Sequence, residues 1–369
     1  MTVRRVTRVI QWGTGAVGLH ALNFVLDHSE LELVGVKCHT DGKAGKDAGE
    51  IAGRAPVGVL ATKDSEALLS LEADCVLFMP RDVTQLDPTV PDSPGREWVE
   101  AVIPILTSGK NVVSSVASGM HWAQLAHGAQ LRDELAEACE KGSSSIYFTG
   151  IDPGFVTDAL AITMSSVAGR IEQVRTWEFI DYSNYPVPEV MLGMGYGRLP
   201  EDIPRTAAAV LRAGWGGAIY SMADALGAVV EEVVLDVDHF LSPRTVTVAS
   251  GLEIKEGRIG ALRWSLTGMV AGKPRLVINH VNRMGPEMAP DWPNLGAQGG
   301  YRIEIDGFPP YRGDFPLARP GGTGYSLDDA VVMTAARCVN AIDAVVRATP
   351  GYKTVNDLPA FGARYGLLS

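Results

Sequence analysis

The sequence predicts an α/β protein in which an N-terminal, doubly wound parallel sheet is followed by a second α+β domain built on a mixed or antiparallel sheet. Three observations support this fold class. Strand and helix patterns alternate over residues 1–155, strand patterns then follow one another with few helices between them, and a glycine-rich turn joins the first strand to the first helix. Alternation requires helical crossovers and hence parallel strands, whereas consecutive strands pair antiparallel.

The glycine-rich turn is the motif Gly13-Thr14-Gly15-Ala16-Val17-Gly18, which follows the apolar strand Val6–Trp12. An apolar-periodic helix and a second strand, Leu31–Val36, come directly after it. In a G-x-G-x-x-G turn the first glycine permits the tight turn, the second lets a pyrophosphate approach the backbone, and the third lets helix and strand pack closely. The free N–H groups and the helix dipole then hold the phosphates. We therefore predict a Rossmann domain that binds a dinucleotide through Gly13, Thr14, Gly15, Ala16, Val17 and Gly18.

Further strands and helices complete the predicted first domain. Gly109 and Gly142 each follow an amphipathic segment and are expected to end a helix. The predicted strands are Val57–Ala61, Ala73–Met79, Asn111–Ser115 and Ser145–Thr149, and the predicted helices are Ser65–Leu71, Arg96–Ser108 and Gln124–Lys141.

The pattern changes after residue 155. Strands are predicted at 173–180, 231–237, 244–248, 259–270, 275–281 and 301–305, and helices at 155–165 and 204–226. The last helix, 326–348, is expected to pack back on the first domain. The predicted domains are thus 1–155 together with 326–369, which bind the dinucleotide, and 156–325, which bind the substrate. The Gly/Pro-rich segment 308–324 is expected to be a linker with a hinge or lid at Pro320-Gly321-Gly322.

Composition excludes several classes of protein. The net charge of −11 over 369 residues argues against nucleic acid or an anionic membrane as a partner, because phosphate groups attract clustered Lys and Arg. No apolar run is long enough to span a membrane. The cysteines Cys38, Cys75, Cys139 and Cys338 are widely spaced and form no C-x-x-C motif, so neither a zinc site nor a disulfide framework is predicted. We expect a cytoplasmic protein with free thiols, no metal and a small-molecule substrate.

The segment after the second strand bears on the choice of cofactor. NAD-specific sites usually place an acidic residue at the end of this strand to bind the ribose 2′-hydroxyl. Here no carboxylate follows directly, and Lys37, His39, Thr40 and Lys43 are available to a 2′-phosphate. NADP(H) is therefore the preferred cofactor, while Asp41 keeps NAD(H) possible. FAD uses the same fingerprint, but the compact second domain disfavours it.

Ligands of an open parallel sheet lie beyond the carboxyl ends of its strands. This rule selects Met79 and Pro80 after the fourth strand, and Ser115 and Val116 after the fifth, as cofactor contacts. Hydride transfer also needs a proton donor for the reacting heteroatom. His121 is the best-placed titratable group on this argument, although a histidine at a helix start can also merely pack or cap.

Three further residues are candidates for the chemistry. Asp152 either binds a polar substrate group or caps a helix with Pro153 at its first position. Glu178 lies on an apolar strand, on the solvent face or buried, and Tyr182 either donates a proton or packs. The catalytic candidates are therefore His121, Glu178, Asp152 and Tyr182, and the remaining histidines, His280 among them, are interpreted as structural or surface residues. Apolar side chains that are expected to line the pocket, or else to form ordinary core, include Trp177, Phe179, Tyr182, Met191 and Met194.

Several motifs recur together in one known group of proteins. They are the glycine-rich turn, Gly45-Lys46-Asp47-Ala48-Gly49-Glu50, Asn111-Val112-Val113-Ser114-Ser115, Gly150-Ile151-Asp152-Pro153-Gly154-Phe155 and Asp357-Leu358-Pro359. In this order they resemble the dihydrodipicolinate reductase-like superfamily, in the branch of 2,4-diaminopentanoate dehydrogenase and the native amine dehydrogenases. The resemblance implies a Rossmann domain, an α/β substrate domain that also forms a homodimer, and NAD(P)H-dependent reduction of a C=N or C=O bond.

The resemblance has one notable departure. Amine-forming members carry a Glu after the fifth strand that polarises the carbonyl and the amine, whereas this chain has Val116-Ala117-Ser118. The proton donor is therefore expected at His121, Glu178 or a tyrosine. The leading hypothesis is an oxidoreductase that transfers hydride to or from a small ketone, aldehyde, imine or amine. The alternatives are a non-catalytic NAD(P)-binding sensor or regulatory protein, and a lyase or isomerase that uses a tightly held cofactor.

Overall fold

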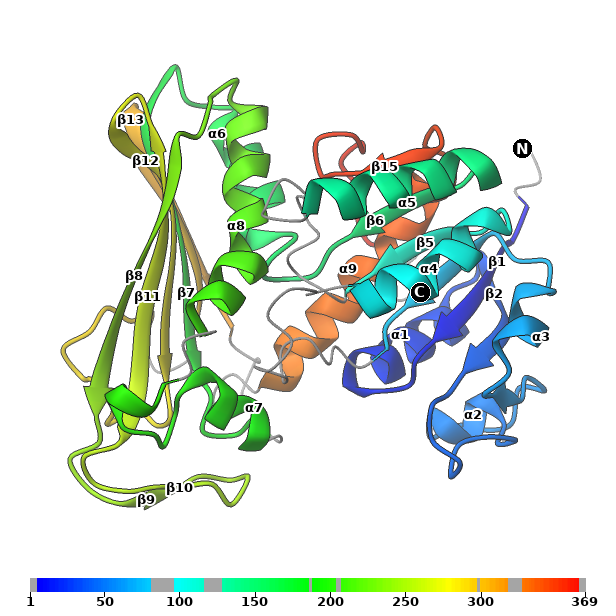
Figure 1. Cartoon of the computed structure of the whole chain (residues 1–369), viewed down its shortest axis with the longest axis horizontal. Helices are drawn as coiled ribbons and strands as arrows, with labels where there is room; N and C mark the ends of the chain where they lie inside the picture. The colour runs from blue at the N-terminus through cyan, green and yellow to red at the C-terminus, as the bar shows by residue number, and fades with distance from the viewer. Residues whose placement is uncertain are drawn as a thin grey trace. The chain divides into compact units, whose positions relative to one another are not determined.

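The structure is a computed structural model of the whole chain, and it forms two compact units (Figure 1). It describes residues 5–80, 96–115, 128–185, 188–203, 207–296, 299–317 and 327–364. Among these, the residues up to 152 and those from 331 onward build the first unit, and residues 153–330 build the second.

The first unit contains a seven-stranded parallel sheet, as the sequence predicts. Its strand order is β15-β6-β5-β4-β1-β2-β3, so the chain starts near the middle and winds outward in both directions. The strands are β1 (Thr7–Trp12), β2 (Leu31–Lys37), β3 (Ala61–Thr62), β4 (Cys75–Phe78), β5 (Asn111–Ser114), β6 (Ser145–Phe148) and β15 (Gly351–Lys353).

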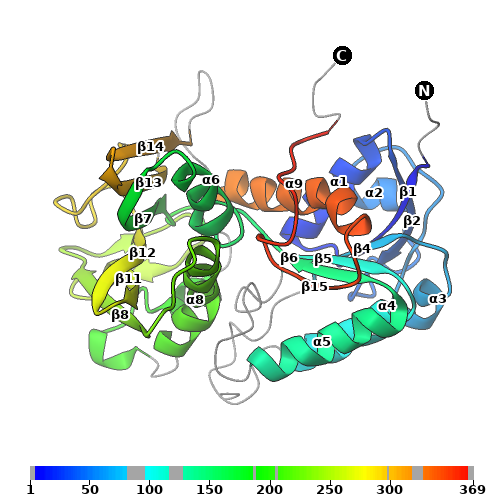
Figure 2. The same cartoon turned by 90° about the horizontal axis from the view of Figure 1, so that it is seen from above.

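Helices cover both faces of this sheet (Figure 2). Alternate strand residues face opposite sides, so that Val76 and Phe78 pack in one apolar core while Cys75 and Leu77 pack in the other. The first core includes side chains of α3 (Ser65–Leu69), α4 (Arg96–Thr107) and α5 (Gly128–Gly142), and the second includes those of α1 (Ala16–Asp27) and α9 (Leu327–Val346). The short α2 spans Ala48–Ile51.

The last long helix returns to the sheet of the first unit. Cys338 of α9 donates to the carbonyl of Thr149 at 3.3 Å, and Thr334 accepts from the Ile151 N–H at 3.3 Å. After the helix, β15 pairs parallel with β6 and adds the seventh strand. β15 is not predicted from the sequence, because it is only three residues long and follows Pro350.

The second unit is built on a six-stranded mixed sheet with the order β14-β13-β7-β12-β11-β8. β7 and β12 are parallel and the other neighbours are antiparallel, which confirms the predicted mixed sheet. The helices α6 and α8 contact this sheet (Figure 1). The strands are β7 (Arg170–Asp181), β8 (Glu232–Leu241), β11 (Ile259–Val270), β12 (Lys273–Arg283), β13 (Gly300–Phe308) and β14 (Tyr311–Pro316). The other elements are a π-helix (Val156–Leu160), α6 (Ala161–Ser165), α7 (Pro188–Met194), a 3₁₀ helix (Pro200–Asp202), α8 (Ala207–Ala225) and the hairpin of β9 (Val246–Thr247) and β10 (Glu253–Ile254).

Two sequence expectations about local structure are wrong. The expected linker 308–324 begins with the strand β14, which tolerates Gly313 and Pro316 because an edge strand pairs on one side only. The third strand begins at Ala61 rather than at Val57, because the Asp47 carboxylate accepts the N–H groups of Val57 and Gly58 and holds that segment as a turn. The expected hinge Pro320-Gly321-Gly322 lies outside the described residues.

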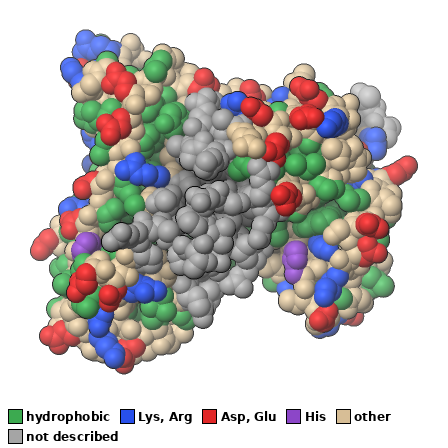
Figure 3. All heavy atoms as spheres, in the orientation of Figure 1, with side chains coloured by type: hydrophobic (Ala, Val, Ile, Leu, Met, Phe, Trp, Pro, Cys, Tyr) green, Lys and Arg blue, Asp and Glu red, His purple; other side chains and the backbone are tan. Residues whose placement is uncertain are grey.

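All four cysteines are free and buried, as predicted. Burial raises the pKa of the Cys139 thiol to about 11 and that of Cys338 to about 12. Among the described helices, none combines the length and apolarity needed to cross a membrane. Acidic and basic side chains are interspersed on the face of the molecule that Figure 3 shows.

Candidate active site

The glycine-rich turn has the geometry that dinucleotide binding requires. Gly13 has a φ of +105°, and a Cβ on it would lie 2.2 Å from the carbonyl oxygen of Met79. A Cβ on Gly18 would lie 2.2 Å from the carbonyl oxygen of Gly13. A Cβ on Gly15, in contrast, would meet no described atom within 4 Å. Gly13 and Gly18 therefore serve the packing of the protein itself, whereas Gly15 leaves an open approach for a ligand.

The N-terminus of α1 is free to hold an anion. Gly15 is the N-cap residue and offers no side-chain hydrogen bond, and the first turn of this helix carries no acidic residue. Gly15 and Ala16 are exposed, while the neighbouring Thr14 is buried. The first N–H groups of a helix lack partners within it, and the helix dipole favours negative charge at this end. These residues fit the pyrophosphate of a dinucleotide.

Basic side chains lie in and beside the loop that follows the carboxyl end of β2. The Lys43 ammonium donates to the carbonyl oxygen of Thr14 at 2.6 Å and to its hydroxyl oxygen at 3.2 Å. His39 and Thr40 are exposed on the same loop. Lys37 is arranged differently: its ammonium donates to the Lys63 carbonyl and lies 5.6 Å from the centre of the Trp12 ring, and burial lowers its pKa. The amino group of Lys37 is thus engaged by the protein itself.

Lys63 is a further basic residue near this loop, and it is not among the residues predicted from the sequence to contact the cofactor. Its ammonium lies 2.8 Å from Asp41, and this hydrogen bond lowers the pKa of the Asp41 carboxyl. Lys63 follows β3, the parallel neighbour of β2, and the carboxyl ends of neighbouring parallel strands share one edge of the sheet. Its position two residues after the predicted third strand was the sequence signal by which Lys63 could have been predicted to lie near the cofactor site.

The remaining predicted cofactor contacts follow β4 and β5. Met79 is buried, and its N–H donates to the Trp12 carbonyl at 2.7 Å, while Pro80 and Ser115 are half-buried. Val116 and His121 lie outside the described residues. Asp152 is half-buried at the end of the first unit. The following helical segment starts at Val156 with Phe155 as its N-cap, so the interpretation of Asp152 as an N-cap is wrong.

Glu178 is part of a row of buried side chains on the sheet of the second unit. It lies opposite His280 of β12 and opposite Tyr301 of β13, and His280 in turn lies opposite Trp264 of β11. Directly paired residues share a face of a sheet. Glu178 is only 5% exposed, and the other three side chains are also buried.

Trp177 and Phe179 belong to the other face of β7. They alternate with Glu178 along the strand and stack on each other, with ring centres 5.7 Å apart. The Trp177 indole donates to Glu304 at 2.9 Å, within a group of ion pairs on this face. The expectation that both line one pocket with Tyr182 is therefore wrong, because the strand period of two separates them from the face of Glu178. Tyr182 instead packs with Met191, Met194 and Tyr196.

Within the described part of the chain, the hydrogen bonds of the Glu178 carboxylate all go to one oxygen. Oε1 lies 3.0 Å from Nδ1 of His280, accepts from Nδ2 of Asn282 at 2.9 Å, and accepts from the Tyr182 hydroxyl at 3.5 Å. Among the described residues, no hydrogen bond reaches Oε2. The structure thus brings the predicted Glu178 and Tyr182 together and adds His280 and Asn282. The signal for these two was a pair of polar residues one pleat apart on the apolar strand β12.

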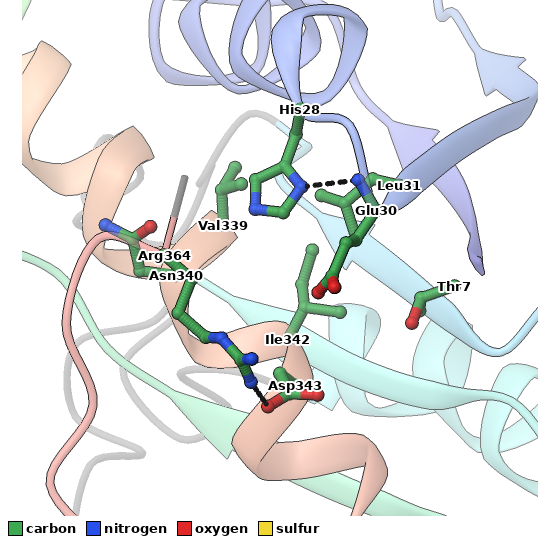
Figure 4. A pocket seen from close by; sticks show the side chains of 9 residues that line it. All are labelled: Thr7, His28, Glu30, Leu31, Val339, Asn340, Ile342, Asp343 and Arg364. Carbon is green, nitrogen blue, oxygen red and sulfur yellow. Dashed lines mark hydrogen bonds and ion pairs between the residues drawn. The ribbon is translucent and has the colours of Figure 1, made fainter. Parts of the chain in front are cut away.

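A small pocket lies at the amino ends of the strands β1 and β2 of the first sheet (Figure 4). Thr7 and Leu31, at the start of β1 and β2, line it together with His28, and Asp343 of α9 pairs there with Arg364 at 2.7 Å. The glycine-rich turn is at the carboxyl end of β1, so this pocket is separate from the predicted cofactor site.

The parallel sheet and its glycine-rich turn define a dinucleotide-binding protein of the Rossmann class. Residues 155–368 match the family model for the 2,4-diaminopentanoate dehydrogenase C-terminal domain. The chain is 32% identical over 362 residues to an amine dehydrogenase of Streptomyces virginiae, covering 95% of both chains. It is 25% identical over 366 residues to the 2,4-diaminopentanoate dehydrogenase of Acetoanaerobium sticklandii, covering 95% of this chain and 93% of that one.

A solved structure shares the fold over nearly the whole chain. The amine dehydrogenase of Mycobacterium smegmatis has a TM-score of 0.73 at 17% identity, covering 96% of this chain and 97% of that chain. Taken together, the family model and the relatives show that the chain belongs to the family of 2,4-diaminopentanoate and amine dehydrogenases. It is accordingly an oxidoreductase that uses a nicotinamide cofactor, which confirms the predicted resemblance and disfavours the non-catalytic sensor.

Proposed function

We propose that the protein interconverts a small amine with the corresponding imine or carbonyl compound, and that Glu178 exchanges the proton with the reacting nitrogen or oxygen. The observation that carries this proposal is the arrangement of the carboxylate. Oε1 is tied to His280 and Asn282, while Oε2 accepts no hydrogen bond from the described residues. The 32% identity with an amine dehydrogenase supports an amine as one partner of the reaction.

Proton and hydride balance in this scheme. A nicotinamide cofactor held at the glycine-rich turn would supply or accept the hydride at the C=N or C=O carbon. In the direction of reduction the carbon accepts the hydride, and Glu178 gives its proton to the neutral imine nitrogen or the carbonyl oxygen. In the direction of oxidation Glu178 takes a proton from the ammonium group, the carbon gives up a hydride, and water converts the resulting iminium to the carbonyl compound and ammonium. Because the carboxylate is 5% exposed, its attraction for a cationic iminium or ammonium nitrogen is weakly screened by water. Tyr182, whose hydroxyl touches the same carboxylate, assists in orienting the substrate.

NADP(H) is the proposed cofactor. Lys43, His39 and Thr40 lie on the loop after β2, where the 2′-phosphate of NADP(H) binds in Rossmann domains. Lys63 adds a further cation and pairs with Asp41, the acid of the Lys37–Lys43 loop that would otherwise favour the 2′-hydroxyl of NAD(H).

The proposed assembly is a cytoplasmic homodimer formed through the second unit. The family resemblance supports the dimer, and four buried, unbonded thiols support a reducing compartment. Light scattering of the purified protein is expected to give the mass of two chains, and a monomer mass would contradict the dimer.

The test begins with titration of the purified protein with NADPH and NADH. Turnover of small carbonyls is then measured with and without ammonia, and amine oxidation is measured with NADP⁺. Glu178→Gln is expected to lower kcat by about 10²-fold or more. Glu172→Gln is the matched control, because Glu172 is exposed on the same strand. Unchanged turnover in Glu178→Gln would overturn the role of Glu178, and tight binding without any turnover would overturn the reaction itself. Turnover that does not depend on ammonia would contradict the proposal that an amine takes part in the reaction. The protein would then be a carbonyl reductase.

A further inference from the structure

We infer that His280 is a positioning residue that fixes the Glu178 carboxylate so that Oε2 faces the reacting atom. This inference rests on the proposed function of Glu178. The two residues lie directly opposite each other in the parallel pair β7 and β12, and Nδ1 of His280 lies 3.0 Å from Oε1 of Glu178. Their side chains are 2% and 6% exposed, so water competes little for this hydrogen bond.

The imidazole is itself held by two tryptophans. Trp264, its antiparallel partner on β11, stacks on it with ring centres 4.0 Å apart and an interplanar angle of 16°. Trp215 of α8 meets the imidazole edge-on at 5.0 Å and 75°, and meets the Trp264 ring at 5.0 Å. Three strands and one helix therefore fix the plane of the imidazole, and with it the direction in which Nδ1 points.

A fixed donor matters because the terminal torsion of a glutamate is broad. Asn282, one pleat further along β12, donates to the same oxygen at 2.9 Å. With both donors on Oε1, the carboxylate plane is set and Oε2 is left for the substrate. Catalytic groups must be held close to their productive geometry. Loss of a hydrogen bond that orients a metal-ligating side chain typically costs about 10–100-fold in activity, and we expect a loss of the same order here. The loss should fall on kcat, since His280 need not touch the substrate to act in this way.

The test uses substitutions that separate the donor from the bulk of the ring. His280→Asn keeps an N–H donor at the position of Nδ1, His280→Gln moves it to the position of Nε2, and His280→Leu removes it. We expect His280→Leu to lower kcat by about 10–100-fold with KM changed less than about threefold, and His280→Asn to restore kcat to within about fivefold of the wild type. His239→Leu is the matched control, because His239 is half-buried on β8 of the same sheet and its Nδ1 has no partner among the described residues.

Each variant is also titrated with NADPH and unfolded with urea. Unchanged kcat in His280→Leu, together with loss of turnover in Glu178→Gln, would overturn this inference and leave the proposed function standing. Unchanged turnover in Glu178→Gln would overturn the proposed function instead. Equal losses of kcat in His280→Asn and His280→Leu would show that the bulk of the ring, not the N–H donor, is required, and would also overturn the inference.

If His280→Leu does not fold, the comparison of His280→Asn with His280→Gln decides. A higher kcat in the Asn variant supports the inference, and equal kcat values contradict it.

Discussion

The Lys43 ammonium lies 2.6 Å from the carbonyl oxygen of Thr14, so that a cation from the loop after β2 is held against the glycine-rich turn. A positive charge at this place attracts the 2′-phosphate of NADPH, and a hydrogen bond to a charged group is worth about 1.5–3 kcal/mol. Lys43→Met is therefore expected to raise the Kd for NADPH by about tenfold or more, which corresponds to about 1.4 kcal/mol. The Kd for NADH should change by less than about threefold. Fluorescence titration with both cofactors measures the two constants.

Lys46→Met is the control for that change, because Lys46 is exposed three residues further along the same loop. It should leave both constants near the wild-type values. A parallel loss of affinity for NADH in Lys43→Met would place Lys43 at the pyrophosphate instead of the 2′-phosphate, and would contradict the proposed preference for NADPH.

Gly15 and Gly18 should respond differently to the same substitution. Gly15 has a φ of −74° and open space around it, so Gly15→Ala should fold with nearly wild-type stability. The added methyl group would stand where the pyrophosphate approaches, and the Kd for NADPH should rise by at least about tenfold. In Gly18→Ala the methyl group would lie 2.2 Å from the Gly13 carbonyl oxygen, and overpacking of this kind costs about 1–3 kcal/mol.

Urea unfolding and NADPH titration of both variants check this prediction. Each variant is the control for the other, since the substitution is the same and the positions are three residues apart. Wild-type affinity for NADPH in a folded Gly15→Ala variant would show that the pyrophosphate does not contact the backbone at Gly15.

Much of the fold follows from patterns that are local in the sequence. The strand β1, the glycine-rich turn and α1 could be predicted because an apolar run, three spaced glycines and a helical period succeed one another within 27 residues. β15 and β14 could not, since a three-residue strand carries little periodicity and an edge strand tolerates the Gly and Pro that usually indicate a loop. The start of β3 is predicted too early. The hydrogen bonds from Val57 and Gly58 to Asp47, which hold the preceding segment as a turn, join residues ten or more positions apart and cannot be read from a local pattern.

The candidate site depends more strongly on contacts that are distant in sequence. Glu178 could be selected as a carboxylate on an apolar strand, but its partners His280 and Asn282 are more than a hundred residues away. The parallel pairing of β7 with β12 brings them together, and that pairing cannot be read from either strand alone. The same holds for Lys63, which reaches Asp41 only through the pairing of β3 with β2.

Asp47 should make stability depend on pH in the acid range. Its carboxylate accepts the N–H groups of Val57, Gly49 and Gly58 at 2.7–2.8 Å, and these bonds lower its pKa below the ordinary value. A carboxyl whose pKa is lower in the folded state stabilises the protein above its unfolded pKa of about 3.9, and this contribution is lost as the pH falls through the folded pKa. Asp47→Asn should therefore be less stable than the wild type at pH 7, and the difference should shrink below about pH 4.

Urea unfolding of both proteins at pH 7, 4 and 3 measures that difference. Asp41→Asn is a suitable comparison, because Asp41 is exposed and its pKa is lowered by Lys63 alone. A stability difference for Asp47→Asn that stays constant over this range would show that the carboxylate charge is not what binds the three N–H groups.

Tyr196 carries a buried hydroxyl that none of the described residues satisfies. The residue is 0% exposed, its hydroxyl has no hydrogen-bond partner among the described residues, and burial raises its pKa well above the ordinary value. A buried hydroxyl without a partner costs about 1–3 kcal/mol, whereas the Tyr196 ring packs with Tyr182 and would still do so as phenylalanine. Tyr196→Phe is therefore expected to raise the free energy of unfolding by about 1 kcal/mol, measured by urea at pH 7 with an unchanged m-value.

Tyr182→Phe, which loses the contact of its hydroxyl with Glu178, should show no such gain. A loss of stability in Tyr196→Phe would mean that the hydroxyl is hydrogen-bonded in solution, and a loss of turnover at unchanged stability would mean that it binds the substrate beside Glu178.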